Sequence, residues 1–207
     1  MTTQMTTVTN LDPYIGRRTH FAGFRLEVPG QKSTDTDHPA IHVTAAYRNN
    51  MTYPELLVFI TEFAELVEKM NGQKIVLTGR GTFSTDGKVD NLIIHHATFE
   101  DPAVMDLLRE FNQRWVWEKK KTDAGDKQNF FSMHVTEGDP DPVGKDAEDV
   151  ARKMDNYLRK KAVIDAAGGE NAVFVASTPY VKYKPDNPKE GGKIVWNLGE
   201  TIPDFRM

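Results

Sequence analysis

The tripeptide His-Val-Thr occurs twice in this chain, at His42 to Thr44 and again at His134 to Thr136. Both copies lie in segments rich in branched and aromatic residues, a composition typical of β-strands. Residues two apart on a strand face the same side, so each copy presents an imidazole beside a hydroxyl while the valine between them faces away. Two such pairs predict two halves of a fold that face one site.

The hydrophobic pattern around the two copies predicts an α+β fold in which the order of elements is nearly duplicated about the middle of the chain. Helices are indicated by apolar residues at three- and four-residue spacing, and strands by short β-branched runs that end in turn residues. An Asp86-Gly87 pair predicts a hairpin. The expected strands are 19–28, 41–47, 74–83, 92–99, 130–136, 173–183 and 193–198, and the expected helices are 54–70, 102–115 and 147–162.

Length and composition predict one domain without a membrane anchor. The 207 residues divide into a polar N-terminal segment (1–18), a single domain (19–200) and a short tail (201–207). The first ten residues have neither a basic start nor an apolar stretch, so we expect no signal peptide, and no run approaches the roughly 18 apolar residues of a membrane span. Cysteine is absent, which excludes disulfides and thiolate metal sites. We therefore expect a soluble, cytoplasmic protein.

The charge balance narrows the choice of partner. The chain carries 26 Lys and Arg against 30 Asp and Glu, a formal net charge of −4. Affinity for duplex DNA rests largely on basic side chains that neutralise phosphates, so this composition argues against a duplex DNA partner. A small nucleotide or oligonucleotide, held locally, fits better than a long RNA.

The repeated motif has the residue types that acid–base chemistry on an anion requires. An unperturbed histidine titrates at about 6.5, so one imidazole of a pair can take a proton while the other gives one. The threonine hydroxyls would hold the anion. The candidate catalytic residues are therefore His42, His134, Thr44 and Thr136.

These residues, together with the apolar strand Phe21 to Val28 and the strand Ile75 to Phe83, make the chain similar to the 2H phosphoesterase superfamily. That superfamily includes the bilobal 2′,5′ RNA ligase-like proteins and cyclic nucleotide phosphodiesterases. The resemblance covers about residues 19–200. It implies two pseudo-symmetric antiparallel sheets, flanked by helices, around a central cleft.

The resemblance further implies that both histidines line the cleft and that both threonines donate hydrogen bonds to a phosphate. The implied activity is a phosphodiesterase that needs no metal and no other cofactor. Possible substrates are 2′,3′-cyclic phosphate ends, 2′,5′-linked oligoadenylates and cyclic oligonucleotide signals. Some viral proteins that resemble this family degrade the cyclic nucleotide signals of host defence. The short link before His42 departs from RNA ligase-like members, which have a helix there.

Residues outside the motif are candidates for substrate binding. Tyr47, Phe131 and Tyr14 could stack on a base, although core packing is the alternative role for each. Arg80, in a glycine-flanked bend, is a candidate to reach the cleft. Glu137 departs from the family pattern, which has an apolar residue after each threonine. A carboxylate there must face away from the phosphate or contact a ribose hydroxyl.

Two other functions remain open at this point. The same fold could hold a nucleotide or RNA end without turning it over, or the repeated tripeptide could be incidental in an interaction protein.

A metal site is rejected, because the loop composition around His38 and His42 excludes a helical zinc pair and no third ligand is evident. The adjacent His95 and His96 must point to opposite faces of a strand. The oligomeric state is left open.

Overall fold

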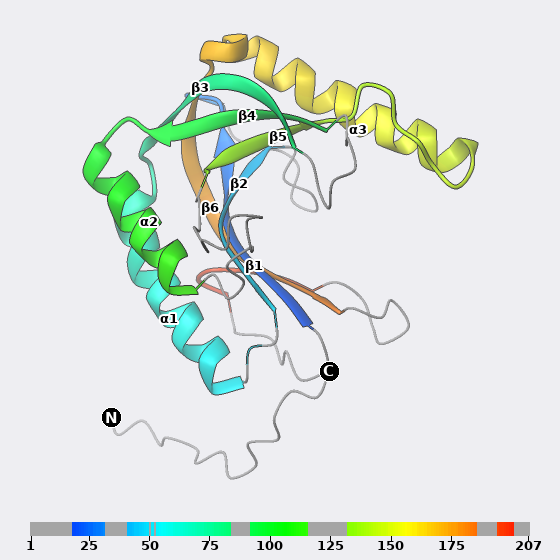
Figure 1. Cartoon of the computed structure of the whole chain (residues 1–207). Coiled ribbons are helices and arrows are strands. Elements are labelled where there is room, and N and C mark those ends of the chain that lie inside the picture. Colours follow the sequence, from blue (N-terminus) through cyan, green and yellow to red (C-terminus); the bar gives the residue numbers. More distant parts are fainter. Residues whose placement is uncertain are drawn as a thin grey trace, which may run out of the picture.

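The computed structural model describes residues 18–31, 41–49, 51, 53–83, 92–115, 132–185 and 194–200, and these residues form an α+β fold (Figure 1). No helix in these segments is both long and apolar enough to cross a membrane. The strands are β1 (Arg18–Glu27), β2 (His42–Asn49), β3 (Lys74–Phe83), β4 (Leu92–Phe99), β5 (His134–Gly138), β6 (Val173–Pro185) and β7 (Ile194–Asn197). The helices are α1 (Tyr53–Met70), α2 (Pro102–Trp115), α3 (Ala147–Ala166) and the short 3-10 helix η1 (Gly169–Asn171).

The order of elements confirms the sequence-based prediction, and the bounds agree within two residues except at the start of β5 and the end of α3. β5 begins at His134, four residues after the expected start, since Ser132 and Met133 lie outside the strand. α3 continues to Ala166, beyond the expected end at 162, because Ile164 extends its apolar side into the core. The predicted turn at Asp86-Gly87 lies outside the described residues, but the strands on either side of it, β3 and β4, do pair antiparallel.

The strands form one closed antiparallel sheet. Their order is β1-β2-β5-β4-β3-β6-β7, and β1 also pairs with β6, which closes the first six strands into a barrel. β7 pairs with the far end of β6, beyond the part of β6 that pairs with β3. The two separate sheets implied by the resemblance are therefore not seen, because the sheet is continuous through the β2–β5 and β3–β6 pairings.

The closed sheet nevertheless consists of two blocks with short seams between them. Long ladders join β2, β1, β6 and β7 into the first block, and β3, β4 and β5 into the second. Between the blocks, β2 meets β5 through Val43 and Val135, and β3 meets β6 through residues 74–76 and 173–175. The two His-Val-Thr copies lie at the first of these seams.

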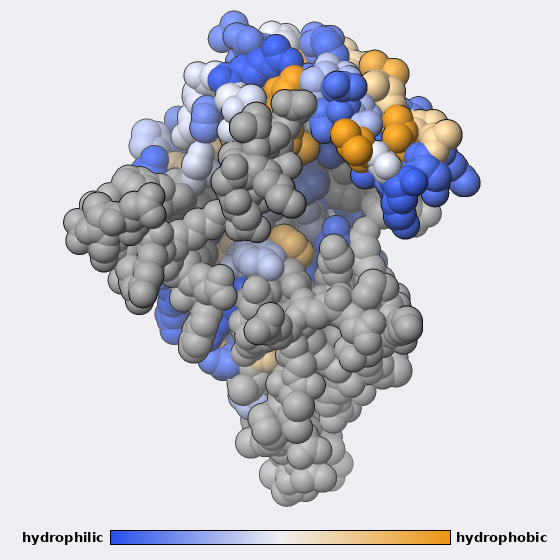
Figure 2. Space-filling model, turned by 45° about the vertical axis from the view of Figure 1, so that its right-hand side comes forward, coloured by the Kyte–Doolittle hydropathy of each residue, from blue (hydrophilic) through white to orange (hydrophobic). Residues whose placement is uncertain are grey.

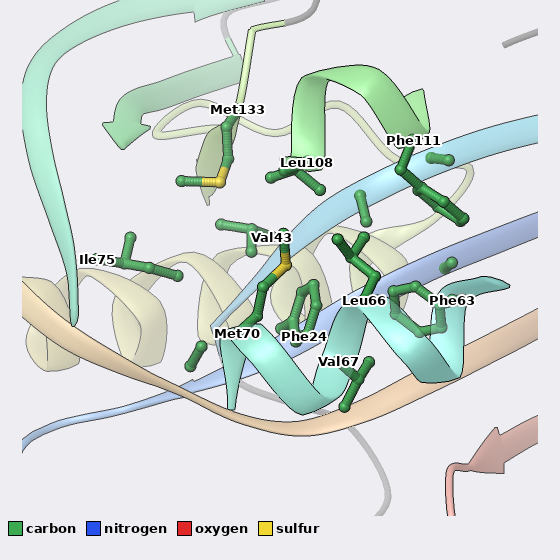
Figure 3. Close-up of a cluster of buried hydrophobic side chains, with 14 of the residues drawn as sticks. Phe24, Val43, Phe63, Leu66, Val67, Met70, Ile75, Leu108, Phe111 and Met133 are labelled. Carbon is green, nitrogen blue, oxygen red and sulfur yellow. The ribbon is translucent and has the colours of Figure 1, made fainter. Parts of the chain in front are cut away.

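The main core lies between the outside of the sheet and helices α1 and α2. α1 has apolar residues at three- and four-residue spacing, so one side of it is buried against the sheet. Figure 3 shows Phe63, Leu66 and Met70 of α1 pointing toward Phe24 and Val43 of the first block. Further aromatic side chains, Phe59, Phe111 and Trp115, join α1 to α2 through ring contacts.

α3 covers the outside of the second block (Figure 1). It begins after Asp146, whose carboxylate accepts a hydrogen bond from the amide of Asp149 at 2.8 Å and so caps the first turn. Tyr157 packs on Gly138 at the end of β5, and a Cβ at Gly138 would lie 3.2 Å from the Tyr157 side chain. Gly138 also has a φ of 131°, which favours glycine.

Candidate active site

The register between β2 and β5 brings the two His-Val-Thr copies side by side. Val43 lies opposite Val135 in this antiparallel pair, so His42 is next to Thr136 and Thr44 is next to His134. Directly opposite residues have Cβ atoms roughly 4.5–5.5 Å apart, and diagonal ones roughly 7–8 Å. Each imidazole therefore has the other copy's hydroxyl as its cross-strand neighbour, and the two imidazoles lie on one diagonal.

The four side chains face away from the helices. Val43 and Val135 are fully buried in the core that the helices cover, so the residues on either side of each valine point to the other side of the sheet. Both histidines and both threonines are half-buried. The helices cover the outer side of the closed sheet, so this side is the inner one, and its four half-buried residues keep part of their surface open to solvent. We call it the histidine face, after His42, Thr44, His134 and Thr136.

His134 is oriented by a backbone carbonyl. Its Nδ1 lies 2.9 Å from the oxygen of Ser132, which can only accept a hydrogen bond, so Nδ1 carries the proton and donates. The Nε2 atom is then the one that exchanges a proton: it is an acceptor in the neutral ring and carries an N–H in the charged ring. A fixed tautomer of this kind suits either a general base or a general acid.

His42 packs against Tyr180 of β6, with ring centroids 6.1 Å apart in an edge-to-face arrangement. Burial raises the pKa of the Tyr180 hydroxyl well above its usual range, although Arg25 acts in the opposite direction. Tyr180 is therefore a proton donor at neutral pH. Gly23 makes room for it, because a Cβ there would lie 3.2 Å from the Tyr180 hydroxyl and 2.5 Å from the carbonyl oxygen of Val43.

Arg25 adds a positive charge to the histidine face. It pairs with His42 in the β1–β2 register, is nearly buried, and donates from Nη2 to Oδ1 of Asn197 at 3.3 Å. Sequence reasoning did not select Arg25 or Tyr180. A signal for Arg25 was present, because it alternates with Phe24 and Leu26 and so had to face away from the apolar side of its strand.

A third histidine lies beside His134. The β4–β5 register places His96 opposite His134, and Nδ1 of His96 lies 3.1 Å from the hydroxyl of Ser132. His95 is buried on the other side of β4 while His96 is exposed, which confirms the prediction that the two adjacent rings point to opposite faces. The sequence alone did not place His96 next to the motif.

Tyr47 lies on the histidine face because of a β-bulge. Ala22 pairs with Ala46 and Gly23 with Thr44, so Ala45 has no partner on β1, and the extra residue turns Tyr47 to the side of Thr44. The carbonyl of Ala45 accepts a hydrogen bond from Nδ2 of Asn112 at 2.8 Å, which ties the bulge to α2. The side chain of Tyr47 is 41% exposed, so the alternative of a core role for it was wrong.

Arg80 lies on the opposite face from the motif, a correction to its candidacy for substrate binding. It pairs with His95 in the β3–β4 register, and both side chains contact Glu137 of β5 on the side that α3 covers. Nε2 of His95 is 2.6 Å from one carboxylate oxygen, and Nη2 of Arg80 is 3.4 Å from the other. Glu137 therefore faces away from the histidine face, one of the two arrangements that its position after Thr136 required.

Two of the candidate substrate-binding residues, Phe131 and Tyr14, lie outside the described part of the chain. Among the residues that are described, no group of three or more His, Asp or Glu side chains is placed to hold a metal ion. The histidine face offers imidazole, hydroxyl and guanidinium groups, which are donors suited to a phosphate.

Comparison with known proteins gives neither a matching family model nor a matching curated protein sequence. The histidine face combines two imidazoles able to exchange protons with hydroxyl and guanidinium groups able to donate hydrogen bonds to an anion.

Proposed function

We propose that this protein is a metal-independent phosphodiesterase that cleaves a small nucleotide or oligonucleotide by two-histidine acid–base catalysis. The observation that carries the proposal is the pairing of Val43 with Val135, which sets His42 beside Thr136 and Thr44 beside His134 on one face of the sheet. An incidental repeat has no reason to be adjacent in space, in register and on the same face.

The proposed mechanism uses one imidazole as base and the other as acid. One ring takes a proton from the nucleophile, either water or a ribose hydroxyl, and the protonated ring delivers a proton to the leaving oxygen. On His134, the atom that does this is Nε2, because Nδ1 donates to the carbonyl of Ser132. The hydroxyls of Thr44 and Thr136 donate to the phosphoryl oxygens as negative charge develops on them. Arg25, next to His42, adds a nearby positive charge.

The two-block construction supports the resemblance to 2H phosphoesterases. Each block supplies one His-Val-Thr strand, and the short β2–β5 seam sets the strands against each other. We propose that the blocks correspond to the two lobes of that fold, with the histidine face as the wall of its cleft. Substrates of this class include 2′,3′-cyclic phosphates, 2′,5′-oligoadenylates and cyclic oligonucleotides.

The deciding experiment compares wild type with His42→Gln and His134→Gln in the presence of EDTA. The substrates are 2′,3′-cyclic AMP, 2′,5′-linked triadenylate and a 3′,3′-cyclic dinucleotide, with products separated by chromatography. Each proton transfer contributes roughly 10²- to 10⁴-fold, so each variant is expected to lose that factor in kcat/KM. A bell-shaped dependence of kcat/KM on pH is expected for wild type, since one imidazole must be protonated and the other neutral.

Threonine variants sharpen the assignment. Thr44→Val and Thr136→Val each remove one hydrogen bond to a charged group and are expected to lower kcat/KM by roughly 10- to 100-fold. Thr82→Val is the matched control, because Thr82 pairs with Ile93, is exposed and lies on the same side of β3 as Arg80. Activity abolished by EDTA would contradict metal-free chemistry. Binding of these nucleotides without any cleavage would instead indicate a nucleotide-binding module.

A further inference from the structure

A pocket of about 530 Å³ opens beside Thr136, at the end of β5. Its volume is in the range of about 300–1,000 Å³ typical of small-molecule sites. Thr136 is one of the four residues of the histidine face and also lines this pocket. The pocket therefore adjoins the histidine face at Thr136, although neither His42 nor His134 lines it.

One wall of the pocket is formed by a polar and cationic side of α3. Lys153, Asn156 and Lys160 follow one another at three- and four-residue spacing and all line the pocket. Lys153 is held in place by other groups: its Nζ is 3.0 Å from Asp149 and donates to the carbonyl of Val143 at 2.8 Å.

Lys160 is the cation of this wall that a ligand can use. It is half-buried, and within the described segments of the chain no carboxylate lies within ion-pair distance of it. Burial and the neighbouring charge of Arg159 lower the pKa of Lys160. An anion bound next to Lys160 would offset both effects, because it would replace the lost solvation and oppose the repulsion.

The opposite wall differs in chemistry. Asp139 and Asp141 provide carboxylates, and the carboxylate of Asp139 accepts a hydrogen bond from the amide of Asp141 at 2.9 Å. Such acceptors suit ribose hydroxyls or the amino groups of a base and would repel a phosphate. Leu92, Pro142 and Val143 add apolar surface. Figure 2 shows apolar side chains among hydrophilic ones at the upper right, where α3 lies in Figure 1.

We propose that this pocket binds the nucleotide next to the cleaved bond, with Lys160 and Asn156 contacting the phosphate of that nucleotide and Asp139 and Asp141 contacting its hydroxyl or amino groups. The inference rests on the proposed function, because Thr136 links the two sites. It makes the substrate a linear or cyclic oligonucleotide with a second phosphate, in preference to a mononucleoside 2′,3′-cyclic phosphate.

A binding measurement tests the pocket without cleavage. AMP and adenosine are titrated into the full-length protein by calorimetry, with Lys160→Gln compared against Arg159→Gln. Both variants remove one positive charge from α3, but Arg159 is exposed, pairs with Asp155 at 3.0 Å and does not line the pocket. We expect Lys160→Gln to weaken AMP binding about 10-fold, the effect of one charged hydrogen bond. We expect adenosine to bind more weakly than AMP.

Loss of affinity to an equal extent in both variants, or no binding of AMP to wild type, would overturn the proposal. A second measurement separates it from the proposed function. The ratio of kcat/KM for 2′,5′-linked triadenylate to that for 2′,3′-cyclic AMP should fall about 10-fold in Lys160→Gln. Cleavage with an unchanged ratio would refute the proposed role of the pocket but not the proposed activity. Lys160-dependent AMP binding without any cleavage would support the pocket as a nucleotide site but refute the proposed activity.

Discussion

The two His-Val-Thr strands present the same side chains but are supported from behind in different ways. Behind β2, Val43 rests on an apolar core in which Phe24 and Phe63 are in contact, with ring centroids 5.3 Å apart. Behind β5, the next residue on the side of Val135 is Glu137, whose side chain is only 4% exposed and is paired with the His95 side chain, itself 3% exposed. One copy of the motif is backed by hydrocarbon and the other by hydrocarbon and an ionisable pair.

The difference shows that the chemistry of a site does not dictate how the scaffold beneath it is built. An apolar core stabilises through burial and close packing, and it does not depend on the partner of any single polar atom. A buried polar group stabilises only while its partner is present, because an unsatisfied one costs free energy. We therefore expect the two strands to respond differently to substitutions behind them.

The largest expected effect is behind β2. Phe63→Ala removes a fully buried ring and should lower the free energy of unfolding by about 3–5 kcal/mol, measured by urea denaturation. Leu57→Ala on the same helix is the control, because Leu57 is exposed and its loss should cost no more than about 0.5 kcal/mol. Equal losses of unfolding free energy in the two variants would contradict the expectation that the apolar core behind β2 stabilises that strand.

A smaller effect is expected behind β5. Glu137→Gln keeps the shape of the side chain but removes the charge that His95 and Arg80 contact, and should lower the free energy of unfolding by about 1–3 kcal/mol. Glu100→Gln is the control, since Glu100 is exposed and lies 3.6 Å from Lys74, and exposed pairs contribute at most about 1 kcal/mol. If Glu137→Gln matched this control, the buried pair would not stabilise β5.

The smallest expected effect is on stability at low pH, and it involves α3, the helix that covers β5. Ion pairs with Lys153 and then Arg152 lower the pKa of Asp149 from 3.8 to about 2. A carboxyl whose pKa is lowered on folding stabilises the protein above its unfolded pKa and loses that contribution as the pH falls through the folded pKa. The difference in stability between wild type and Asp149→Asn should thus be constant above pH 5 and shrink from about pH 4 to pH 2.

Urea denaturation at pH 6, 4 and 3 measures this difference directly. Asp155→Asn is a suitable companion variant, because Asp155 also forms an ion pair on α3 but is exposed. A difference for Asp149→Asn that grows toward low pH would contradict the sign derived from its lowered pKa.

The sequence predicted the elements well because their signals are local. The apolar spacing of α1 and the alternation of the strands depend on neighbours a few positions away. The closure of the sheet was not predictable in this way, since the pairing of β1 with β6 joins opposite ends of the chain. α3 was predicted too short, because Ile164 lies beyond the thin apolar stripe that marked the helix.

For the site, the sequence identified the two motif copies and their shared orientation, but not the register that sets each histidine beside the other copy's threonine. It also could not place Tyr47, whose direction depends on one unpaired residue, Ala45. Arg80 and Glu137 lie together on the far side because alternation along β3 and β5 puts them there. Alternation fixes a face only once the partner strands are known.

The pairing of β1 with β6 also determines when the sheet can close during protein synthesis. The second block is continuous in sequence from β3 to β5, so it can assemble while later residues are still being added. The first block needs β6, since Arg18 pairs with Pro185. Closing so long a loop is slow relative to local pairing. The neighbours of His134 on β4 are therefore available before β6 is synthesised, whereas the contact of His42 with Tyr180 cannot form until β6 has been made.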